Sequence, residues 1–219
     1  MKNYNLFLKE IAEKEGITLF GTCKIEELKD LFHQEIKENL PSLLYAISIG
    51  YRLSNGVLAT IKDAPSLLYK HHYKSINWLL DQAVEKIASV IQKEGKLAVA
   101  IPASQIVDWD KQTGHLSHIL IGQKCGMGWI GRSGTLVNAK YGAQVRYATV
   151  LTDMQLEVSS PSEGSCGNCK KCIEACPAGA ITEEGYDKKK CMEKIKEFAR
   201  IRGIGVGICG ICIKACVPN

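Results

Sequence analysis

The sequence predicts an α+β domain followed by a small iron–sulfur module, and three observations carry that prediction. Residues 1–158 alternate between stretches with helical periodicity and stretches with strand periodicity. The next six residues are polar and contain Ser, Pro and Gly, which is typical of a domain boundary. Eight of the ten cysteines then lie between Cys166 and Cys216. We therefore expect two domains, residues 1–158 and residues 159–219.

Apolar spacing and helix-stopping residues define the expected elements at the start of the chain. Leu6, Leu8, Ile11 and Ala12 form a helical stripe that Gly16 ends. The elements expected next are a strand at 17–21, a helix at 25–39, a strand at 43–53 and a turn at Asn55-Gly56.

The rest of the first domain begins with a long helix. Its start is expected at residues 63–66, and its apolar positions continue through Trp78 and Ile91 to Gly95. After it we expect a strand at 96–101, a helix at 115–125, and two paired strands at 136–138 and 144–151 that turn at Tyr141-Gly142. Beyond the boundary, short helices are expected between the cysteine groups.

Composition and charge exclude several classes of protein. The 219 residues are 46% hydrophobic and 23% charged, which is typical of a globular chain and not of a disordered or fibrous one. No apolar run reaches the ~18 residues of a membrane helix, and the first ten residues lack a signal-peptide pattern, so we expect a cytoplasmic protein. The net charge is +5, of which +4 lies in residues 166–219 (10 basic, 6 acidic). That charge suits an acidic redox partner or a nucleic acid, and it is also common on a solvated surface.

The strongest motif is a run of four cysteines followed by proline. Cys166, Cys169, Cys172 and Cys176 are spaced C-x2-C-x2-C-x3-C and precede Pro177. In this bacterial ferredoxin spacing three cysteines wrap one 4Fe–4S cluster, and the fourth ligates the other cluster.

The cysteine count fits two such clusters with none left over. By the crossing pattern, the first cluster would take Cys166, Cys169, Cys172 and Cys216. The second cluster would take Cys176, Cys191, Cys209 and Cys212. The alternative is zinc, which also binds paired C-x2-C groups. Cys23 and Cys125 are expected to be small buried residues and not ligands.

A glycine-rich segment invites a different interpretation. Gly126, Gly128 and Gly131 match G-x-G-x-x-G, and Asp153 lies about 20 residues further on, as in a dinucleotide-binding fingerprint. That fingerprint needs a strand before it and a helix after it, and here a helical segment precedes it. We therefore do not expect NAD(P) or flavin at this loop. Closely spaced glycines still indicate that the backbone approaches a ligand or a neighbouring strand.

The combined motifs resemble the epoxyqueuosine reductase family and its short relatives. The resemblance rests on residues 126–136, Tyr141-Gly142, residues 149–153 and the cysteine run, with support from residues 101–105 and 114–118. It covers about residues 5–219. The resemblance implies a nitroreductase-like α+β core that binds cobalamin, followed by a ferredoxin-like module with two 4Fe–4S clusters. Corrinoid-dependent reductive dehalogenases resemble the chain more distantly.

The resemblance also implies roles for single residues. Asp108, between Val107 and Trp109, is the candidate proton donor, with a pKa raised by its apolar surroundings, and Asp110 is the fallback. The candidate corrinoid-binding residues are Gly126, Gly128, Trp129, Gly131, Arg132, Ser133 and Arg146. Arg132 stands where the family usually has Lys. His115 and His118 could share one face of a site, although helix-cap or core positions are expected for them.

Three functions remain open from the sequence. The first is a redox enzyme that passes electrons through two 4Fe–4S clusters to a corrinoid in the core. The second is an electron carrier or corrinoid-reactivating protein without its own substrate. The third is an epoxyqueuosine reductase acting on tRNA, for which weak binding is expected because the family's helical-repeat tail is not seen after Asn219. An external donor of the ferredoxin or flavodoxin type and a corrinoid or corrinoid protein are the expected partners.

Overall fold

The computed structural model describes residues 3–218, which form two compact units. Unit 1 comprises the residues up to Tyr51, Ile76–Met127 and Arg146–Ser162. Unit 2 comprises Arg52–Ser75, Gly128–Val145 and the residues from Glu163 onward. The chain therefore passes between the units several times, so the units are not consecutive stretches of sequence. The last passage from unit 1 to unit 2 lies between Ser162 and Glu163. The expected domain boundary between residues 158 and 159 is close to it and stays a prediction.

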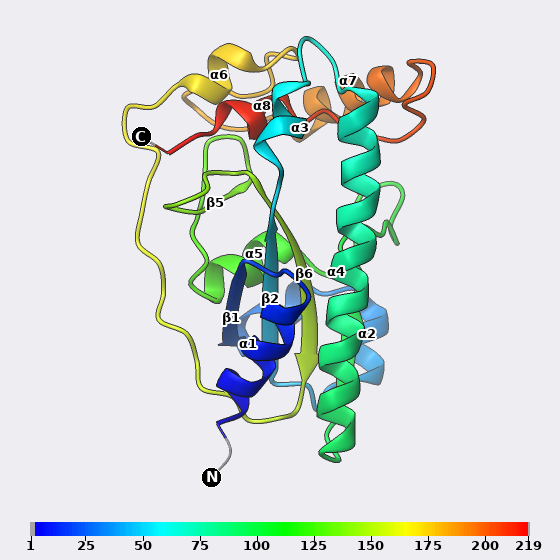
Figure 1. The fold of residues 1–219 in the computed structure, drawn as a ribbon, viewed down its shortest axis with the longest axis vertical. Coiled ribbons are helices and arrows are strands. Elements are labelled where there is room, and N and C mark those ends of the chain that lie inside the picture. The colour runs from blue at the N-terminus through cyan, green and yellow to red at the C-terminus, as the bar shows by residue number, and fades with distance from the viewer. Residues whose placement is uncertain (1–2, 219) are drawn as a thin grey trace. The chain divides into compact units, whose positions relative to one another are not determined.

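A four-stranded sheet forms the centre of unit 1. Its strands are β1 (Leu19–Lys24), β2 (Tyr45–Arg52), β3 (Ala98–Ile101) and β6 (Val145–Thr152), in the order β1-β2-β6-β3 (Figure 1). Strand β1 pairs antiparallel with β2, and β3 pairs antiparallel with β6. The central strands β2 and β6 are buried on both faces along most of their length, which indicates that both faces of the sheet are covered.

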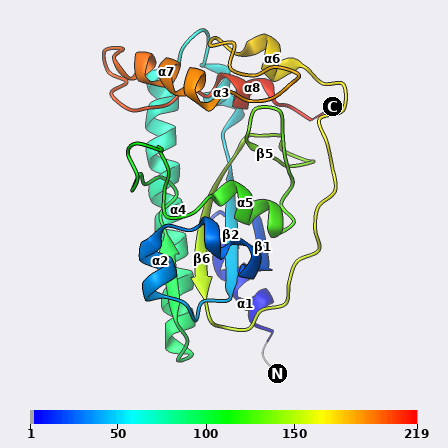
Figure 2. The same cartoon turned by 180° about the vertical axis from the view of Figure 1, so that it is seen from behind.

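Helices cover the two faces of this sheet. Helices α1 (Tyr4–Lys14) and α4 (Leu67–Lys93) lie in front of the strands in Figure 1. Helices α2 (Gln34–Asn39) and α5 (His118–Lys124) lie in front of them when the molecule is seen from behind (Figure 2). Three expected helices are confirmed. The helix that Gly16 ends is α1, the long helix that Gly95 ends is α4, and the helix expected at 115–125 is α5. Gly16 and Gly95 follow α1 and α4 with positive φ, as stop signals require.

Unit 2 is built from short elements. Helix α3 (Asn55–Ala59) and the two-stranded ribbon of β4 (Trp129–Ile130) and β5 (Leu136–Val137) precede the cysteine region. Helices α6 (Lys171–Ala175), α7 (Lys188–Ala199) and α8 (Ile211–Ala215) follow, and α6 packs against α8. The mixture of helices and strands agrees with the expected α+β class. The nitroreductase-like core and the ferredoxin-like module stay predictions.

Three expected elements were wrong. The helix expected at 25–39 is a 3-10 turn at Glu26–Leu31 and the separate helix α2, because Phe32 is extended and the His33 amide bonds the His115 carbonyl. The turn expected at Asn55-Gly56 is the start of α3, capped by Ser54. Strand β5 pairs with β4, and β6 lies between β2 and β3, so the expected pairing of 136–138 with 144–151 is wrong; Asn138 instead forms a bridge with Gly142, which precedes β6.

No helix in the described part of the chain is long and apolar enough to cross a membrane.

Candidate functional site

The two C-x3-C pairs of unit 2 have the same local structure. Cys172 lies in α6 and Cys176 is its C-cap, while Cys212 lies in α8 and Cys216 is its C-cap. Since a C-cap ends the helix, each helix presents one sulfur from its turn and a second from its end. Because α6 and α8 pack together, the halves of the cysteine region meet although they lie about 40 positions apart in sequence.

One group of four thiols forms around α6 and the end of α8. Burial raises the pKa of Cys172, and the nearby charges of Cys166 and Cys169 raise it further. Burial likewise raises the pKa of Cys216, which also responds to Cys166, Cys172 and Cys169. The interaction of Cys216 with these three residues means that the last cysteine joins the first three.

A second group forms around α7 and the start of α8. Burial raises the pKa of Cys209 to about 11, with Cys191 and Cys176 as further causes. Burial raises the pKa of Cys212 to about 12, with Cys209, Cys191 and Cys176 adding to it. The charge of Cys172, from the first group, also raises the pKa of Cys212, so the two groups are neighbours. The division of the eight cysteines into two ligand sets stays a prediction.

The spacing of the sulfurs is the geometry that a metal centre would have to adjust. Four thiolates around one zinc ion at 2.3 Å place their sulfurs roughly 3.8 Å apart. Among residues 3–218, no three cysteine sulfurs lie within 4.8 Å of one another. The choice between zinc and an iron–sulfur cluster therefore rests on the cysteine spacing in the sequence.

Chain segments outside the cysteine run pack on the cluster loops. Arg132 donates from its guanidinium to the Gly167 carbonyl at 2.7 Å, between Cys166 and Cys169. A Cβ added to Gly131 would lie 3.3 Å from the Cys166 sulfur. Near the second group, the Ala180 amide donates to the Cys176 sulfur at 3.3 Å.

Tyr186 is a contributor that the sequence reasoning missed. Its ring lies against Gly134, where an added Cβ would stand 2.7 Å from the ring. Burial raises its pKa, and a side-chain hydrogen bond with Cys191 raises it further. The tyrosine therefore lies beside the second cysteine group. No motif marks it, because Tyr186 is five residues from Cys191 and outside the C-x2-C spacing.

The glycine-rich segment is explained by close packing within the chain. An added Cβ on Gly126 would overlap the Ser160 carbonyl, and one on Gly128 would overlap the Val137 carbonyl. Helix α5 precedes the segment and the short strand β4 lies within it, whereas the dinucleotide-binding context needs a strand before the segment and a helix after it. Asp153 accepts a hydrogen bond from the Leu97 amide at 2.8 Å, so it fixes the approach to β3.

The other predicted corrinoid residues have partners of their own. The Ser133 hydroxyl bonds the Thr135 hydroxyl at 2.7 Å, and the Trp129 ring packs against Gly164. In unit 1, Arg146 donates to Asn77 Oδ1 at 2.8 Å and to the Ala103 carbonyl at 3.2 Å. The indole Nε1 of Trp129 and Nε of Arg132 are buried without a hydrogen-bond partner in the described part of the chain. These two nitrogens are the polar atoms of the segment that a ligand could satisfy.

Asp108 lies in a solvent-exposed loop of unit 1. Its Oδ1 accepts from the Lys111 amide at 2.8 Å and from the Asp110 amide at 3.1 Å. The hydrogen bond from Lys111 is the largest cause that lowers the pKa of Asp108. The expectation of a raised pKa was wrong for this conformation, because Trp109 is 70% exposed and supplies no apolar wall. A role in proton transfer would require the loop to rearrange.

The two histidines of the α5 region separate. His118 is partly buried, donates from Nε2 to the Pro102 carbonyl at 2.9 Å and accepts from Thr149 at 2.8 Å. Loss of solvent around the ring lowers its pKa to about 4, so it is neutral at pH 7. His115 turns instead to Glu35, as described below. Cys23 and Cys125 are both buried and both belong to unit 1, whereas the other eight cysteines belong to unit 2.

Comparisons of sequence place the chain near one kind of protein. No protein-family model matches it. It is 26% identical to an epoxyqueuosine reductase of Listeria monocytogenes, over 98% of this chain and 58% of the relative. It is 35% identical to that of Bacillus anthracis, over 49% of this chain and 30% of the relative. The chain thus spans about half the length, or less, of the curated relatives it matches.

Comparisons of structure agree on the fold. The epoxyqueuosine reductase of Streptococcus thermophilus superposes with a TM-score of 0.67 at 19% identity, over 98% of this chain and 66% of that one. A catabolic reductive dehalogenase superposes with a TM-score of 0.73 at 19% identity, over 95% of this chain and 31% of that one. The predicted resemblance to epoxyqueuosine reductases is confirmed.

Proposed function

The chain is epoxyqueuosine reductase-like in sequence and in fold, and on that premise we propose that it is an iron–sulfur oxidoreductase that reduces a corrinoid. The eight free cysteines of unit 2, with the spacing of a ferredoxin run, are the single observation that carries the proposal. The choice of a corrinoid is supported by a protein of similar fold, a reductive dehalogenase for which B12-dependent dehalogenation is suggested. When bound, the clusters would relay single electrons and the corrinoid would supply the reacting metal.

The cysteines fit this role by their protonation. Without metal, burial and mutual repulsion hold the pKa of Cys209 and Cys212 at about 11 and about 12, so these thiols are neutral at pH 7. Close thiolates in a buried group become stable only beside strong positive charge. The groups are therefore built for a multiply charged metal centre, and their burial limits access of water to it.

The main chain and nearby side chains would tune and hold the clusters. The amide of Ala180 donates to the Cys176 sulfur, and such hydrogen bonds are one of the controls on cluster potential. Arg132 anchors the loop that carries Cys166 and Cys169 and adds a positive charge beside a ligand set that is negative when deprotonated. Tyr186 contributes a hydroxyl next to Cys191.

Binding and reduction of cobalamin test the proposal directly. Iron–sulfur-loaded protein is reduced, freed of excess reductant without air, and mixed with cobalamin. We expect the corrin absorption bands to change and the cobalamin to remain with the protein on gel filtration. Oxidised cobalamin that is left unchanged by reduced protein would contradict the proposal. Reduction without retention would favour the electron carrier over an enzyme with its own corrinoid site.

We propose tRNA as a second candidate, as substrate of the same centre. One epoxyqueuosine reductase with a similar fold is described with an epoxyqueuosine-modified tRNA stem loop. In unit 2, a surface hollow is lined by Arg52, Lys140, Tyr141 and Lys214. The Arg52 guanidinium and the Lys140 ammonium lie 5.0 and 5.3 Å from the centroid of the Tyr141 ring. Cations with an aromatic ring suit a phosphate backbone with an unstacked base.

Salt-dependent binding of a tRNA stem loop tests this candidate. Neutralising contacts with phosphates release counterions, so affinity should fall linearly with the logarithm of salt concentration. We expect Lys140→Gln to reduce the slope by about 0.7–0.9, the value for one phosphate contact. Exposed Lys188→Gln, outside the hollow, is the matched control. Binding without salt dependence, or equal slopes in both variants, would contradict the candidate.

A further inference from the structure

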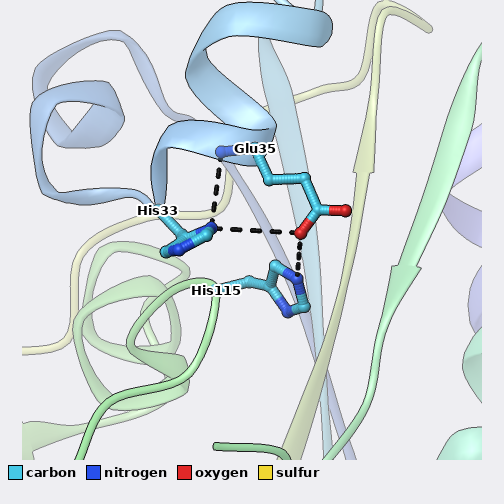
Figure 3. A group of neighbouring side chains, drawn as sticks. All are labelled: His33, Glu35 and His115. Atoms are coloured by element: carbon cyan, nitrogen blue, oxygen red, sulfur yellow. Dashed lines mark hydrogen bonds and ion pairs between the residues drawn. The ribbon is translucent and has the colours of Figure 1, made fainter. Parts of the chain in front are cut away.

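Two histidines and a glutamate gather in unit 1, outside the centre described above. His33 and Glu35 lie at the start of α2, and His115 lies in the segment before α5 (Figure 3). His115 Nε2 stands 3.0 Å from Glu35 Oε2, and His33 Nδ1 stands 3.9 Å from the same oxygen. All three ligand atoms lie within 4.8 Å of one another. Within residues 3–218, this is the one group of three potential metal-ligating atoms that is so compact.

The backbone holds the two histidine segments together. The His33 amide donates to the His115 carbonyl at 2.8 Å, although the two residues are 82 positions apart. The two imidazole rings meet edge to face with centroids 5.7 Å apart. His33 also caps α2, where the Glu35 amide approaches Nδ1 at 3.4 Å. This contact is long and weak, so a stronger ligand could replace it.

We infer that His33, Glu35 and His115 bind one divalent transition-metal ion of the zinc type. Two imidazoles and one carboxylate, with remaining positions open to water, form a donor set that zinc accepts. Calcium and magnesium are disfavoured because they prefer oxygen ligands. In a tetrahedral site with ligands at about 2.1 Å, ligand atoms lie roughly 3.4 Å apart. The separations of 3.0 and 3.9 Å bracket that value.

The side chains leave room for the small adjustment that binding requires. The Glu35 side chain is 66% exposed, so it can rotate toward an ion, while His115 is 16% exposed and stays fixed. To bind the ion through Nε2, His115 must carry its proton on Nδ1. That atom is buried without a hydrogen-bond partner in the described part of the chain.

The position suggests what the ion would do. His115 ends the loop that carries Asp108, and His33 begins α2. An ion bound by both histidines would link this loop to the start of α2. That start lies directly after Phe32, where the expected helix is interrupted. Since such an ion binds the folded state, it should raise the free energy of unfolding of unit 1 with the logarithm of the ratio of free ion concentration to Kd.

Zinc uptake by the iron–sulfur-loaded protein tests the inference, because the unit 2 cysteines are then occupied by iron. The protein is dialysed without air against low-micromolar Zn²⁺, and zinc and iron are counted together. We expect one zinc per chain in the wild type. His33→Gln and Glu35→Gln should each weaken binding about tenfold or more, on the scale by which disturbing a ligand shell lowers affinity. His71→Gln, an exposed histidine of α4, should keep the wild-type zinc content.

A second measurement separates this site from a folding defect. All variants should retain wild-type iron content, and Zn²⁺ should raise the unfolding temperature of the wild type and of His71→Gln, but not of Glu35→Gln. Three results would overturn the inference. They are no zinc uptake by the wild type, equal uptake by Glu35→Gln, and loss of uptake in His71→Gln.

Discussion

The guanidinium of Arg132 donates to the main-chain carbonyl of Gly167 at 2.7 Å, and this bond links the glycine-rich segment to the loop between Cys166 and Cys169. A hydrogen bond from a charged donor contributes about 1.5–3 kcal/mol. The loop otherwise depends on its metal and on short turns such as the Cys169 amide to Cys166 carbonyl bond. Arg132 therefore positions the loop that would hold the first cluster of the proposal.

Replacing Arg132 by methionine should loosen that loop. We expect the variant to lose iron at least about tenfold faster than the wild type under a chelator, the rate equivalent of roughly 1.4 kcal/mol. Iron release is followed by absorbance. Arg202→Met removes an exposed arginine of unit 2 and should leave the release rate unchanged. Equal release from Arg132→Met and the wild type would show that the bond does not hold the loop.

Gly142 and Gly205 offer a matched pair for testing Cys216. Both have the same backbone conformation, with φ of 60° and 62°, so alanine strains the chain equally at each. An added Cβ on Gly142 would overlap the Cys216 carbonyl, whereas Gly205 has no atom within 4 Å of that position. Gly142→Ala should therefore lose about half of the iron, and Gly205→Ala should keep it. Similar iron in both variants would remove the link between Gly142 and the first cluster.

Asp108 gives a prediction about proton transfer. Its lowered pKa means that it is ionised at neutral pH in the described loop conformation. In the epoxyqueuosine reductase of Bacillus subtilis, which this chain resembles in fold, the loop of a catalytic aspartate is seen swung out of the active site. If Asp108 donates a proton during turnover, Asp108→Asn should lower the rate about 100-fold while iron content and cobalamin binding stay unchanged. Turnover within a few-fold of wild type would assign Asp108 to the loop alone.

His118 gives a prediction about pH and stability. Burial lowers its pKa from 6.5 to about 4 in the folded protein, so the unfolded state takes up a proton first as the pH falls. The free energy of unfolding is therefore unaffected by His118 above pH 6.5. It falls as the pH drops from 6.5 toward 4, by about 3 kcal/mol in total. His118→Gln should flatten the dependence of the urea midpoint on pH between 7 and 5. Exposed His71→Gln should follow the wild type, and a variant at His118 with the full wild-type slope would refute the assignment.

Local patterns in the sequence predict a cluster site because the spacing that wraps a cluster lies within a dozen residues. The assignment of Cys216 to the first group follows from the ferredoxin crossing pattern and stays a prediction. The break at Phe32 did not follow, because it depends on the bond from His33 to the His115 carbonyl, far away in sequence. The cluster of His33 and Glu35 with His115 was missed for the same reason. Turn residues suggested that 136–138 and 144–151 pair, yet β6 reaches β3 instead, a long-range choice that no local pattern encodes.

Asp108 shows the opposite case, in which neighbours in sequence misled. Val107 and Trp109 suggested an apolar environment, but the loop exposes Trp109 and turns the carboxylate toward the amides of Lys111 and Asp110. Burial of a side chain is a property of the fold around it and not of adjacent residues. For the glycine-rich segment, the sequence allowed close approach either to a ligand or to a neighbouring strand. Close packing on the Val137 and Ser160 carbonyls accounts for two of its glycines.

Iron and sulfide counts in the wild type and in Cys216→Ala test the central claim, that eight cysteines hold two 4Fe–4S clusters with ligands that cross between the halves. Protein purified without air should contain about eight iron and eight sulfide per chain. Cys216→Ala should fall to about four of each, with Cys23→Ala and Cys125→Ala unchanged. One or two zinc ions per colourless chain, or eight iron retained in Cys216→Ala, would contradict the account.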